Sequence, residues 1–313
     1  MFKVSPKKRF SSFFKNEDSR FLLVCGLKFS GVYIVSVAFI YYILWLIVSI
    51  NSVYFESKIT GFTPELRDAF FETIFSFLYR LLPEILMIFV LLFFAGIFVG
   101  KVLLRPFEVM AKYAQARTQG EAVTYNPDVF SDYKLLTRFS EFFFLYIENS
   151  LSEKKLSKNT IPSIFLKIHT PPFERVFFIH FLVIIILISV LTDLFLFYIL
   201  TEVRNGLIDL SLEILSTKDL TIGYFFENQS HILETVTVAA FLIITVGYIG
   251  LCFHLYSKIS GAIFGFFATM RSFMKGNYQA RVHLVGYAHI RPLSRSLNKF
   301  LDHVERECSI DNK

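Results

Sequence analysis

Four long apolar stretches constrain the fold of this chain more than any other feature. Each has about 20 to 25 residues, enough for a helix to cross the hydrocarbon core of a bilayer. Charged residues make up only 19% of the chain, below the roughly 25% typical of a soluble domain. The sequence therefore predicts an all-α polytopic membrane protein with four transmembrane helices. The predicted spans are Gly31–Ile50, Leu81–Gly100, Val176–Leu200 and about Ile232–Tyr256.

The charges that flank these stretches predict the orientation of the chain. Basic residues collect before the first span, between the second and third, and after the fourth, whereas the loops at about 51–79 and 201–232 are net acidic. Short loops rich in Lys and Arg stay on the cytoplasmic side. We therefore expect a multi-pass protein of the inner (plasma) membrane with both termini in the cytoplasm. Cysteines do not populate the outer loops, so a disulfide framework is not expected.

The chain divides into two similar halves, each a membrane hairpin followed by a helical module. The interval from Lys101 to Gly120 equals that from Ser257 to Gly276, which favours an internal duplication. The predicted segments are a basic cytoplasmic N-terminus at 1–29, a first hairpin with a short outer loop at 30–100, a first module at 101–149, a linker at 150–173, a second hairpin at 174–256, a second module at 257–307 and a tail at 308–313.

The second module contains two amphipathic helical patterns joined by a connector. Gly276 is placed to end the first helix as a C-cap glycine. Tyr278, Val282 and Leu284 supply spaced apolar anchors in an extended connector. Apolar residues at three- and four-residue steps mark one buried stripe on each helix. These stripes are Ile263, Phe266, Phe267, Met270 and Phe273 on the first helix, and Leu293, Leu297, Phe300, Leu301 and Val304 on the second.

This arrangement resembles a HAMP domain, the signal-relay module that links membrane helices to output domains in bacterial receptors. The segment 276–282 is similar to the start of the family's connector, and Leu293, Leu297, Asn298 and Phe300 are similar to the register of its second helix. The family usually opens its first helix with a proline, where this copy has Ala262. The family's acidic pair and glycine before the second helix are replaced by Ala288, His289 and Arg291.

The first module resembles the same family. Arg105, Pro106 and Phe107 match the opening of the family's first helix. A later stripe of Leu135, Phe139, Phe142 and Tyr146 parallels Leu293, Leu297, Phe300 and Val304. That alignment makes the first connector shorter by about two residues. The alternative interpretation is a pair of ordinary juxtamembrane helical hairpins with apolar stripes.

The resemblance implies a function in signal relay. Members pair two chains into a parallel four-helix coiled coil whose packing changes when a span shifts. Here the two modules pair with each other, or the chain forms a homo-oligomer. Since no output segment follows the second helix, we expect a signalling partner protein in trans. The residues that the resemblance assigns to the relay are Pro106, Gly120, Gly276, Leu293, Leu297 and Phe300.

Two acidic residues lie within the predicted spans. A charged group at the centre of a bilayer costs at least about 2.5–3.5 kcal/mol, so it usually has a charged or polar partner or a functional role. Asp193 lies about seven residues from the outer end of the third span, and Glu84 lies near the outer end of the second. Arg80, or water inside the bundle, is a candidate partner for Asp193. These residues support two alternative functions, a small transport or channel subunit that uses Asp193, or a structural subunit of a membrane complex.

The sequence contains no pattern typical of an enzyme. It has no HExxH pair, no CxxC pair, no nucleophile-elbow serine and no glycine-rich nucleotide loop. The seven histidines show no metal-binding spacing, so we predict no catalytic residue, no metal and no cofactor. The single tryptophan lies in the first span, and the basic residues follow topology, so nucleic acid is not an expected partner. The bilayer is the expected partner.

Overall fold

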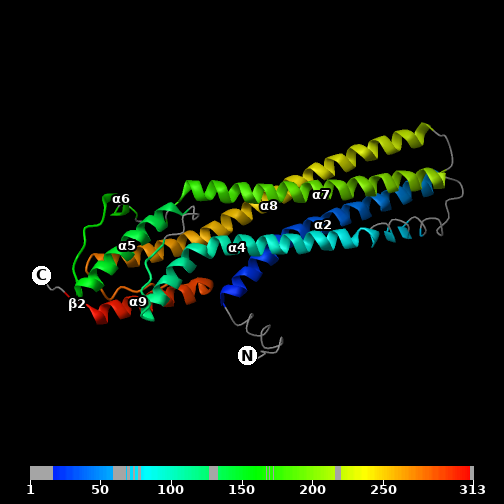
Figure 1. Cartoon of the computed structure of the whole chain (residues 1–313). Coiled ribbons are helices and arrows are strands. Elements are labelled where there is room, and N and C mark those ends of the chain that lie inside the picture. Colours follow the sequence, from blue (N-terminus) through cyan, green and yellow to red (C-terminus); the bar gives the residue numbers. More distant parts are fainter. Residues whose placement is uncertain are drawn as a thin grey trace, which may run out of the picture. The chain divides into compact units, whose positions relative to one another are not determined.

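A computed structural model describes residues 17–58, 68, 71–72, 75–76, 79–126, 133–166, 168, 170–171, 173–215 and 220–310. The structure is 84% helical, which confirms the predicted all-α fold (Figure 1). The elements in order are α2 (Glu17–Lys58), α4 (Leu82–Thr118), α5 (Lys134–Glu153), β1 (Lys155–Leu156), α6 (Ser163–Leu166), α7 (Arg175–Leu215), α8 (Leu220–Met274), the 3₁₀ helix η1 (Ala288–Ile290), α9 (Arg291–Glu307) and β2 (Ser309–Ile310).

Four helices are long and apolar enough to cross a membrane, which agrees with the four predicted spans. The candidate spans are Ser19–Tyr54, Leu82–Thr118, Arg175–Glu202 and Glu234–Met274. The helices are longer than the sequence predicted, because α7 continues to Leu215 and α8 begins at Leu220, within the predicted outer loop 201–232. Most of the other predicted outer loop, 51–79, and residues 1–16 of the basic N-terminus lie outside the described residues.

Two of these helices continue without a break from a span into a module. Helix α8 has 55 residues, about 80 Å at the usual rise of an α-helix, and it includes all of the first stripe of the second module. Helix α4 has 37 residues and passes through Pro106. Pro106 therefore lies inside a continuous helix rather than at a helix start.

The chain divides into two compact units. One consists of residues 1–25, 97–182 and 252–313, and we call it the module unit. The other consists of residues 26–96 and 183–251, and we call it the span unit. Inside the span unit, tyrosine hydroxyls donate to backbone carbonyls of neighbouring helices, from Tyr248 to Phe29 at 3.2 Å and from Tyr33 to Ile85 at 3.4 Å.

Candidate functional site

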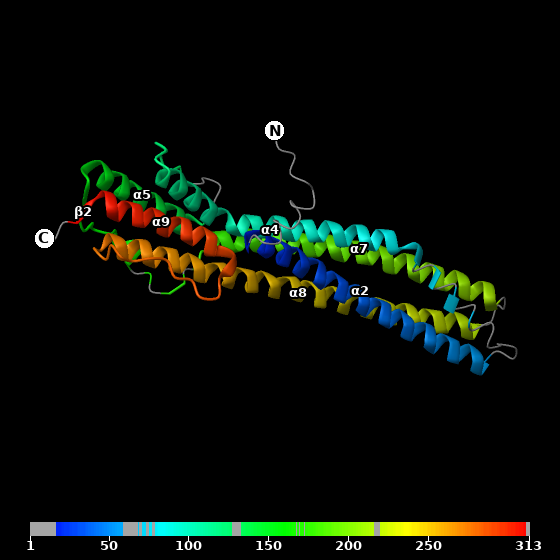
Figure 2. The same ribbon diagram turned by 90° about the horizontal axis from the view of Figure 1, so that it is seen from below.

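The two modules pack against each other within the one chain and form a four-helix bundle. We call this bundle the paired-module bundle, made of α4 from Lys101 onward, α5, α8 from Ser257 onward, and α9. Helices α5 and α9 lie side by side (Figure 2). Aromatic contacts join each helix of the first module to each helix of the second. Ring centroids lie 4.2 to 6.1 Å apart in the pairs Phe107–Phe266, Phe139–Phe267, Phe143–Phe273, Phe144–Phe300 and Tyr113–Phe300.

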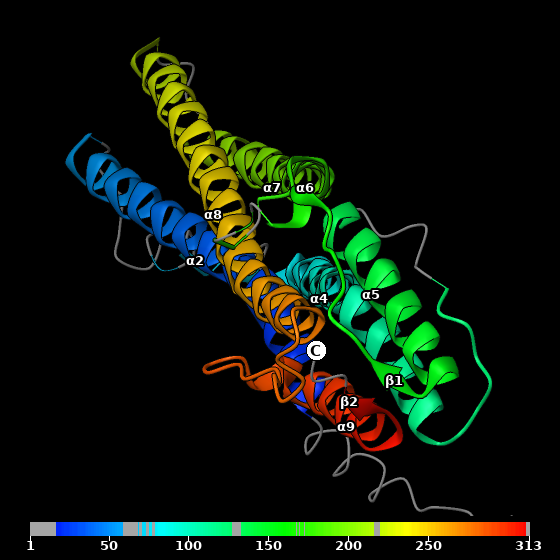
Figure 3. The same ribbon diagram turned by 90° about the vertical axis from the view of Figure 1, so that its left-hand side faces the viewer.

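A short parallel strand pair closes the bundle at the ends of the two second helices. Strand β1 follows α5, strand β2 follows α9, and Lys155 pairs with Ser309 (Figure 3). Beside the strands, the Cys308 thiol donates to the carbonyl of Ser150 at 3.4 Å. Because the strands are parallel and each continues its helix, the two modules meet at equivalent positions. No pattern in the sequence predicted these strands.

The first helix of the second module ends at the predicted glycine. Gly276 has φ +101°, a conformation that L side chains rarely adopt. Its N–H donates to the carbonyl of Phe273, and the N–H of Asn277 donates to the carbonyl of Ser272, both at about 3 Å. This pair of bonds is a Schellman motif. A Cβ on Gly276 would lie 2.8 Å from Cε of Lys158, so the linker also covers this position.

The first module ends its first helix in the same way. Gly120 has φ +84°, its N–H donates to the carbonyl of Arg117, and the N–H of Glu121 donates to the carbonyl of Ala116. The two glycines therefore form the same Schellman motif in both copies. In contrast to Gly276, no atom of the described residues lies within 4 Å of a Cβ built on Gly120. The shared cap supports the equivalence of the two modules.

Helix α9 buries most of the predicted stripe. Leu297 and Phe300 are fully buried, together with Leu301 and Val304. Leu293 is half-buried, and the next residue, Ser294, takes the inward position. The first turn of α9 is therefore rotated slightly from the face that Leu293 indicated.

Helix α5 buries a different face from the one that the sequence indicated. Phe139 and Tyr146 of the predicted stripe are buried, but Leu135 and Phe142 are half-buried. The inward positions belong to Leu136, Phe139, Ser140, Phe143, Phe144, Tyr146, Ile147 and Ser150. The strand pairing explains the difference. The paired strand residue lies 35 residues after the connector glycine in the first module (Gly120 to Lys155) and 33 residues after it in the second (Gly276 to Ser309). This segment of the first module is therefore longer by two residues, whereas the predicted alignment of stripes made the first connector shorter by about two.

The connector of the second module is held by side chains of α9 and by the surface of α8. The guanidinium of Arg281 donates to the carboxylates of Asp302 and Glu305. The side-chain amide of Asn298 accepts the N–H of Val282 at 2.8 Å and donates to its carbonyl at 3.1 Å. These bonds satisfy the backbone of a buried connector residue, which explains the presence of Asn298 at that register.

The same connector runs back along α8. A Cβ on Gly265 would lie 2.5 Å from Cδ2 of Leu284, and a Cβ on Gly261 would lie 2.0 Å from Oη of Tyr287. Glycine at these two helix positions therefore allows the connector to approach α8 closely. Since the connector reverses the direction of α8, α9 starts beside Gly261 and then runs in the same direction as α8.

A junction at Glu174 joins three helices of the module unit. Its carboxylate accepts the N–H of Leu135, the second residue of α5, at 2.8 Å, and its own N–H donates to the hydroxyl of Tyr256 on α8 at 2.9 Å. Glu174 directly precedes α7, so the start of a candidate span caps a helix of the bundle. The rings of Tyr133 and Phe177 stack beside it with centroids 3.7 Å apart. Burial, followed by the nearby Tyr256 and Glu174, raises the pKa of Tyr133 well above its usual value.

No pattern in the sequence indicated Glu174, which directly follows the linker, or Arg271, which faces it. The guanidinium of Arg271 donates to the carbonyl of Ile168 at 2.7 Å and lies over the ring of Phe267. The N–H of Asn159 donates to the carbonyl of Met274 at the end of α8. Arg271 and Asn159 belong to no sequence motif, and they find their partners only because the linker runs along α8.

The two acidic residues of the predicted spans, Glu84 and Asp193, are both half-buried. The hydroxyl of Thr245 donates to Oδ2 of Asp193 at 3.2 Å, and the hydroxyl of Ser189 lies 3.2 Å from that of Thr245. Oδ1 of Asp193 and Oε2 of Glu84 are buried, and neither has a hydrogen-bond partner among the described residues. Within that part of the chain, no ion pair joins Asp193 to Arg80.

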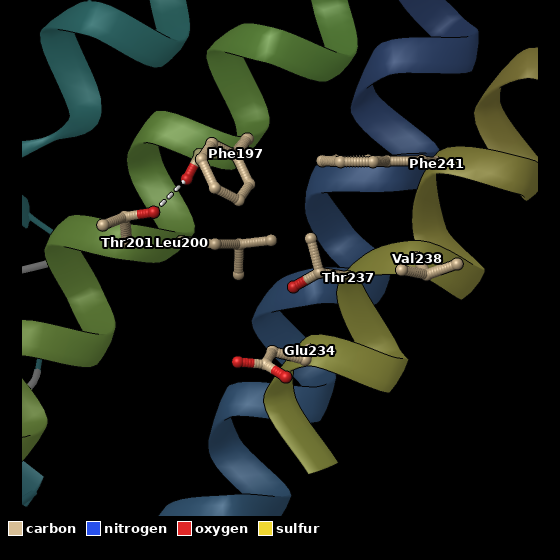
Figure 4. Close-up of a pocket in the computed structure, with 7 residues that line it drawn as sticks. All are labelled: Phe197, Leu200, Thr201, Glu234, Thr237, Val238 and Phe241. Atoms are coloured by element: carbon tan, nitrogen blue, oxygen red, sulfur yellow. Dashed lines mark hydrogen bonds between the residues drawn. The ribbon is translucent and has the colours of Figure 1, made fainter. Parts of the chain in front are cut away.

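A pocket of about 160 Å³ lies between α7 and α8 in the span unit (Figure 4). The side chains of Phe197, Leu200 and Phe241 form much of its apolar wall, and the Thr201 hydroxyl donates to the carbonyl of Phe197. Glu234 is its one charged lining residue. This lining holds no set of catalytic groups, and no cluster of three or more metal-ligating side chains occurs among the described residues. No protein-family model, curated protein or solved structure matches this chain.

Proposed function

We propose that this chain is a signal-relay or regulatory protein of the inner membrane, with both termini in the cytoplasm. A change at the spans would pass through the HAMP-like paired-module bundle to a partner protein in trans. The observation that carries this proposal is the continuity of α4 and α8, each of which is one helix from a candidate span into the bundle. Helix α8 contains no proline, whereas α4 contains Pro106 within its helical run.

The physics of the bundle suits a relay. An α-helix transmits an axial shift or a rotation along its length, and close-packed interfaces change between discrete arrangements rather than deforming continuously. The core of the bundle consists largely of interlocking aromatic rings contributed by both modules, such as Phe107 with Phe266 and Tyr113 with Phe300. A change in one module helix therefore repacks its neighbours. The Glu174 junction adds a route from α7 into α5.

The pairing of the modules is tested by disulfide crosslinking in membranes. On a background without the native cysteines, Lys155→Cys with Ser309→Cys places two thiols at Cα positions paired across the strands, within the reach of a disulfide. We expect a bond within one chain, seen by mass spectrometry of a species at monomer mass. Each single variant is the control, because it can crosslink only between chains. Crosslinking confined to dimers would refute the intramolecular bundle.

The relay itself is tested with a second cysteine pair. Met110 and Met270 are buried and lie one turn beyond Phe107 and Phe266, whose rings are 5.0 Å apart. Thin and thick phosphatidylcholine bilayers change the tilt of spans without contacting the bundle. We expect the crosslinking rate of Met110→Cys with Met270→Cys to differ between these bilayers. An identical rate at every thickness, with the strand pair still crosslinking, would refute the relay and favour a structural subunit.

Ion transport is the second candidate function, and the buried Oδ1 of Asp193 is the observation that favours it. A buried carboxylate oxygen in a span is suited to bind and release a proton or a cation. This alternative predicts that Asp193→Asn abolishes ion flux into proteoliposomes while both cysteine pairs still crosslink. Flux that is absent in the unmodified protein, or unchanged in Asp193→Asn, would exclude it.

A further inference from the structure

The pocket between α7 and α8 lies where two candidate spans end. Its residues on α7 fall in the last two turns of the span Arg175–Glu202, and its residues on α8 fall at the start of the span Glu234–Met274. All of them belong to the span unit. A site at the end of a span is in reach of both the hydrocarbon and the water, so it suits a ligand with an apolar part and a polar part.

The apolar and polar walls of the pocket lie at opposite ends. The rings of Phe197 and Phe241 lie at one end and the carboxylate of Glu234 at the other, with Leu200 and Thr237 between them (Figure 4). The two ring centroids are 6.4 Å apart and the ring planes meet at 60°. Seven residues separate Glu234 from Phe241, about 10 Å along the helix. Leu200 and Thr237 are buried, whereas Phe197 and Glu234 are exposed, so the pocket opens on one side.

The volume of the pocket limits the size of its ligand. At about 160 Å³ it is close to a cavity of about 150 Å³, lined by Leu, Ile and Phe, that binds benzene. One aromatic ring therefore fills most of the space between α7 and α8. Aromatic rings pack edge to face on one another at centroid distances of about 4.5–7 Å. A ring of the ligand would meet Phe197 and Phe241 in this way.

Two polar groups of the lining offer hydrogen-bond acceptors. The hydroxyl of Thr201 donates to the carbonyl of Phe197 at 2.9 Å, so its oxygen is left to accept. The carboxylate of Glu234 only accepts. Its Oε2 lies 3.7 Å from Nδ1 of His231, which is longer than a hydrogen bond, and both side chains are more than half exposed. No lysine or arginine occurs among the described lining residues. The site therefore favours a cationic donor over an anion.

We propose that this pocket binds a small aromatic amine, one ring on a short arm that carries an ammonium group. The ring packs against Phe197 and Phe241, and the ammonium donates to Glu234, with the oxygen of Thr201 as a further acceptor. Amphipathic molecules of this kind concentrate at the end of a span, because the ring enters the hydrocarbon and the charge stays in water. Binding at this site does not depend on the proposed relay.

A phospholipid with an amine headgroup carries the same ammonium group, but it fits this pocket less well. Its phosphate would lie beside Glu234 with no cation to bind among the described lining residues. Its acyl chains also exceed a volume of about 160 Å³. The charge and the size of the pocket therefore both favour a free amine.

The test measures binding of tritium-labelled 2-phenylethylamine to the full chain in phosphatidylcholine nanodiscs. Saturable binding is counted above the signal of empty nanodiscs. The competitor 2-phenylethanol keeps the ring and the arm but replaces the ammonium with a neutral hydroxyl. Glu234→Gln removes the charge of the pocket at nearly constant size. The matched control is Glu202→Gln, which removes a carboxylate at the same end of the spans, outside the lining.

We expect Glu234→Gln to weaken amine binding about three- to fivefold, and Glu202→Gln to change it by less than about twofold. The alcohol should compete at least about threefold less well than unlabelled amine in the unmodified protein, and equally well in both variants. Absence of saturable binding, equal losses in both variants, or equal competition by alcohol and amine would overturn the proposal. Loss of amine binding in phosphatidylethanolamine nanodiscs would also overturn it, because it would assign the pocket to lipid. The crosslinks of the paired-module bundle are scored separately, so failure of binding is distinguished from failure of the relay.

Discussion

Removal of the Glu174 carboxylate is expected to loosen the first turn of α5. A helix leaves its first N–H groups without partners inside the helix, and α5 receives no side-chain cap from its own N-cap residue, Tyr133. Glu174, the residue before α7, supplies the missing acceptor, at 2.8 Å from the N of Leu135. It also places a negative charge at the positive end of the helix dipole.

The size of the effect follows from these two contributions. Loss of a capping hydrogen bond costs about 1 kcal/mol, and loss of the charge at a helix N-terminus costs about 0.3–1 kcal/mol. Glu174→Ala should therefore favour opening of this turn by about 1–2 kcal/mol, which is roughly a 5- to 30-fold faster amide exchange. Glu174→Gln keeps an oxygen acceptor and loses the charge, so its exchange should rise about two- to fivefold.

Hydrogen–deuterium exchange with mass spectrometry in detergent measures this opening in peptides that cover the start of α5. The matched control is Glu141→Ala, which removes an exposed carboxylate from the same helix. The control should leave exchange at the first turn unchanged. Equal exchange in Glu174→Ala and Glu141→Ala would refute the assignment of Glu174 as the cap of α5 and remove the route from α7 into the bundle.

Three further changes test other parts of the bundle. Gly276→Ala should lower the unfolding midpoint in denaturant more than Gly120→Ala, because both strain a positive φ by about 1–2 kcal/mol but only Gly276 also contacts the linker; equal losses would contradict this. Asn298→Ala should destabilise the connector by about 2–3 kcal/mol, since two buried backbone groups lose their partner, and limited proteolysis near residue 282 measures this; unchanged cleavage would argue against the clamp. Burial raises the pKa of the Cys308 thiol, so the neutral thiol stabilises the fold below about pH 8.5, and this stabilisation is lost as the pH rises. In Cys308→Ser, the pH profile of thermal unfolding should therefore lack this loss of stability at high pH. A profile identical to that of the unmodified protein would contradict the expectation. In the native protein, Cys308 should react with a maleimide far more slowly than a cysteine placed at the exposed Val285.

The sequence predicted the features that depend on local patterns. Long apolar runs fix membrane-crossing helices by length and composition alone, and the four candidate spans match the four predicted regions. Gly276 and Gly120 end their helices with φ values of +101° and +84°, as a C-cap glycine does. The apolar stripe on α9 also identified the buried Leu297 and Phe300.

Features that depend on pairing between distant segments were not predictable in this way. The buried face of α5 differs from the predicted one because several overlapping apolar stripes exist on that helix, and the partner surface selects among them. The two-residue strands are too short to carry a pattern, and their pairing joins positions about 150 residues apart. Glu174 is one acidic residue between the linker and α7, and its role exists only because the start of α5 lies beside it.

The pairing of Lys155 with Ser309 within one chain affects how assembly of the bundle depends on protein concentration. A bundle assembled from separate copies dissociates as the protein becomes scarce, so its occupancy depends on expression level. Here both halves of the bundle belong to one polypeptide, and the second half always meets the first at the same effective concentration. Assembly of this bundle therefore does not depend on the number of copies in the membrane. Its two halves are also free to diverge in sequence, since neither has to pair with an identical copy of itself.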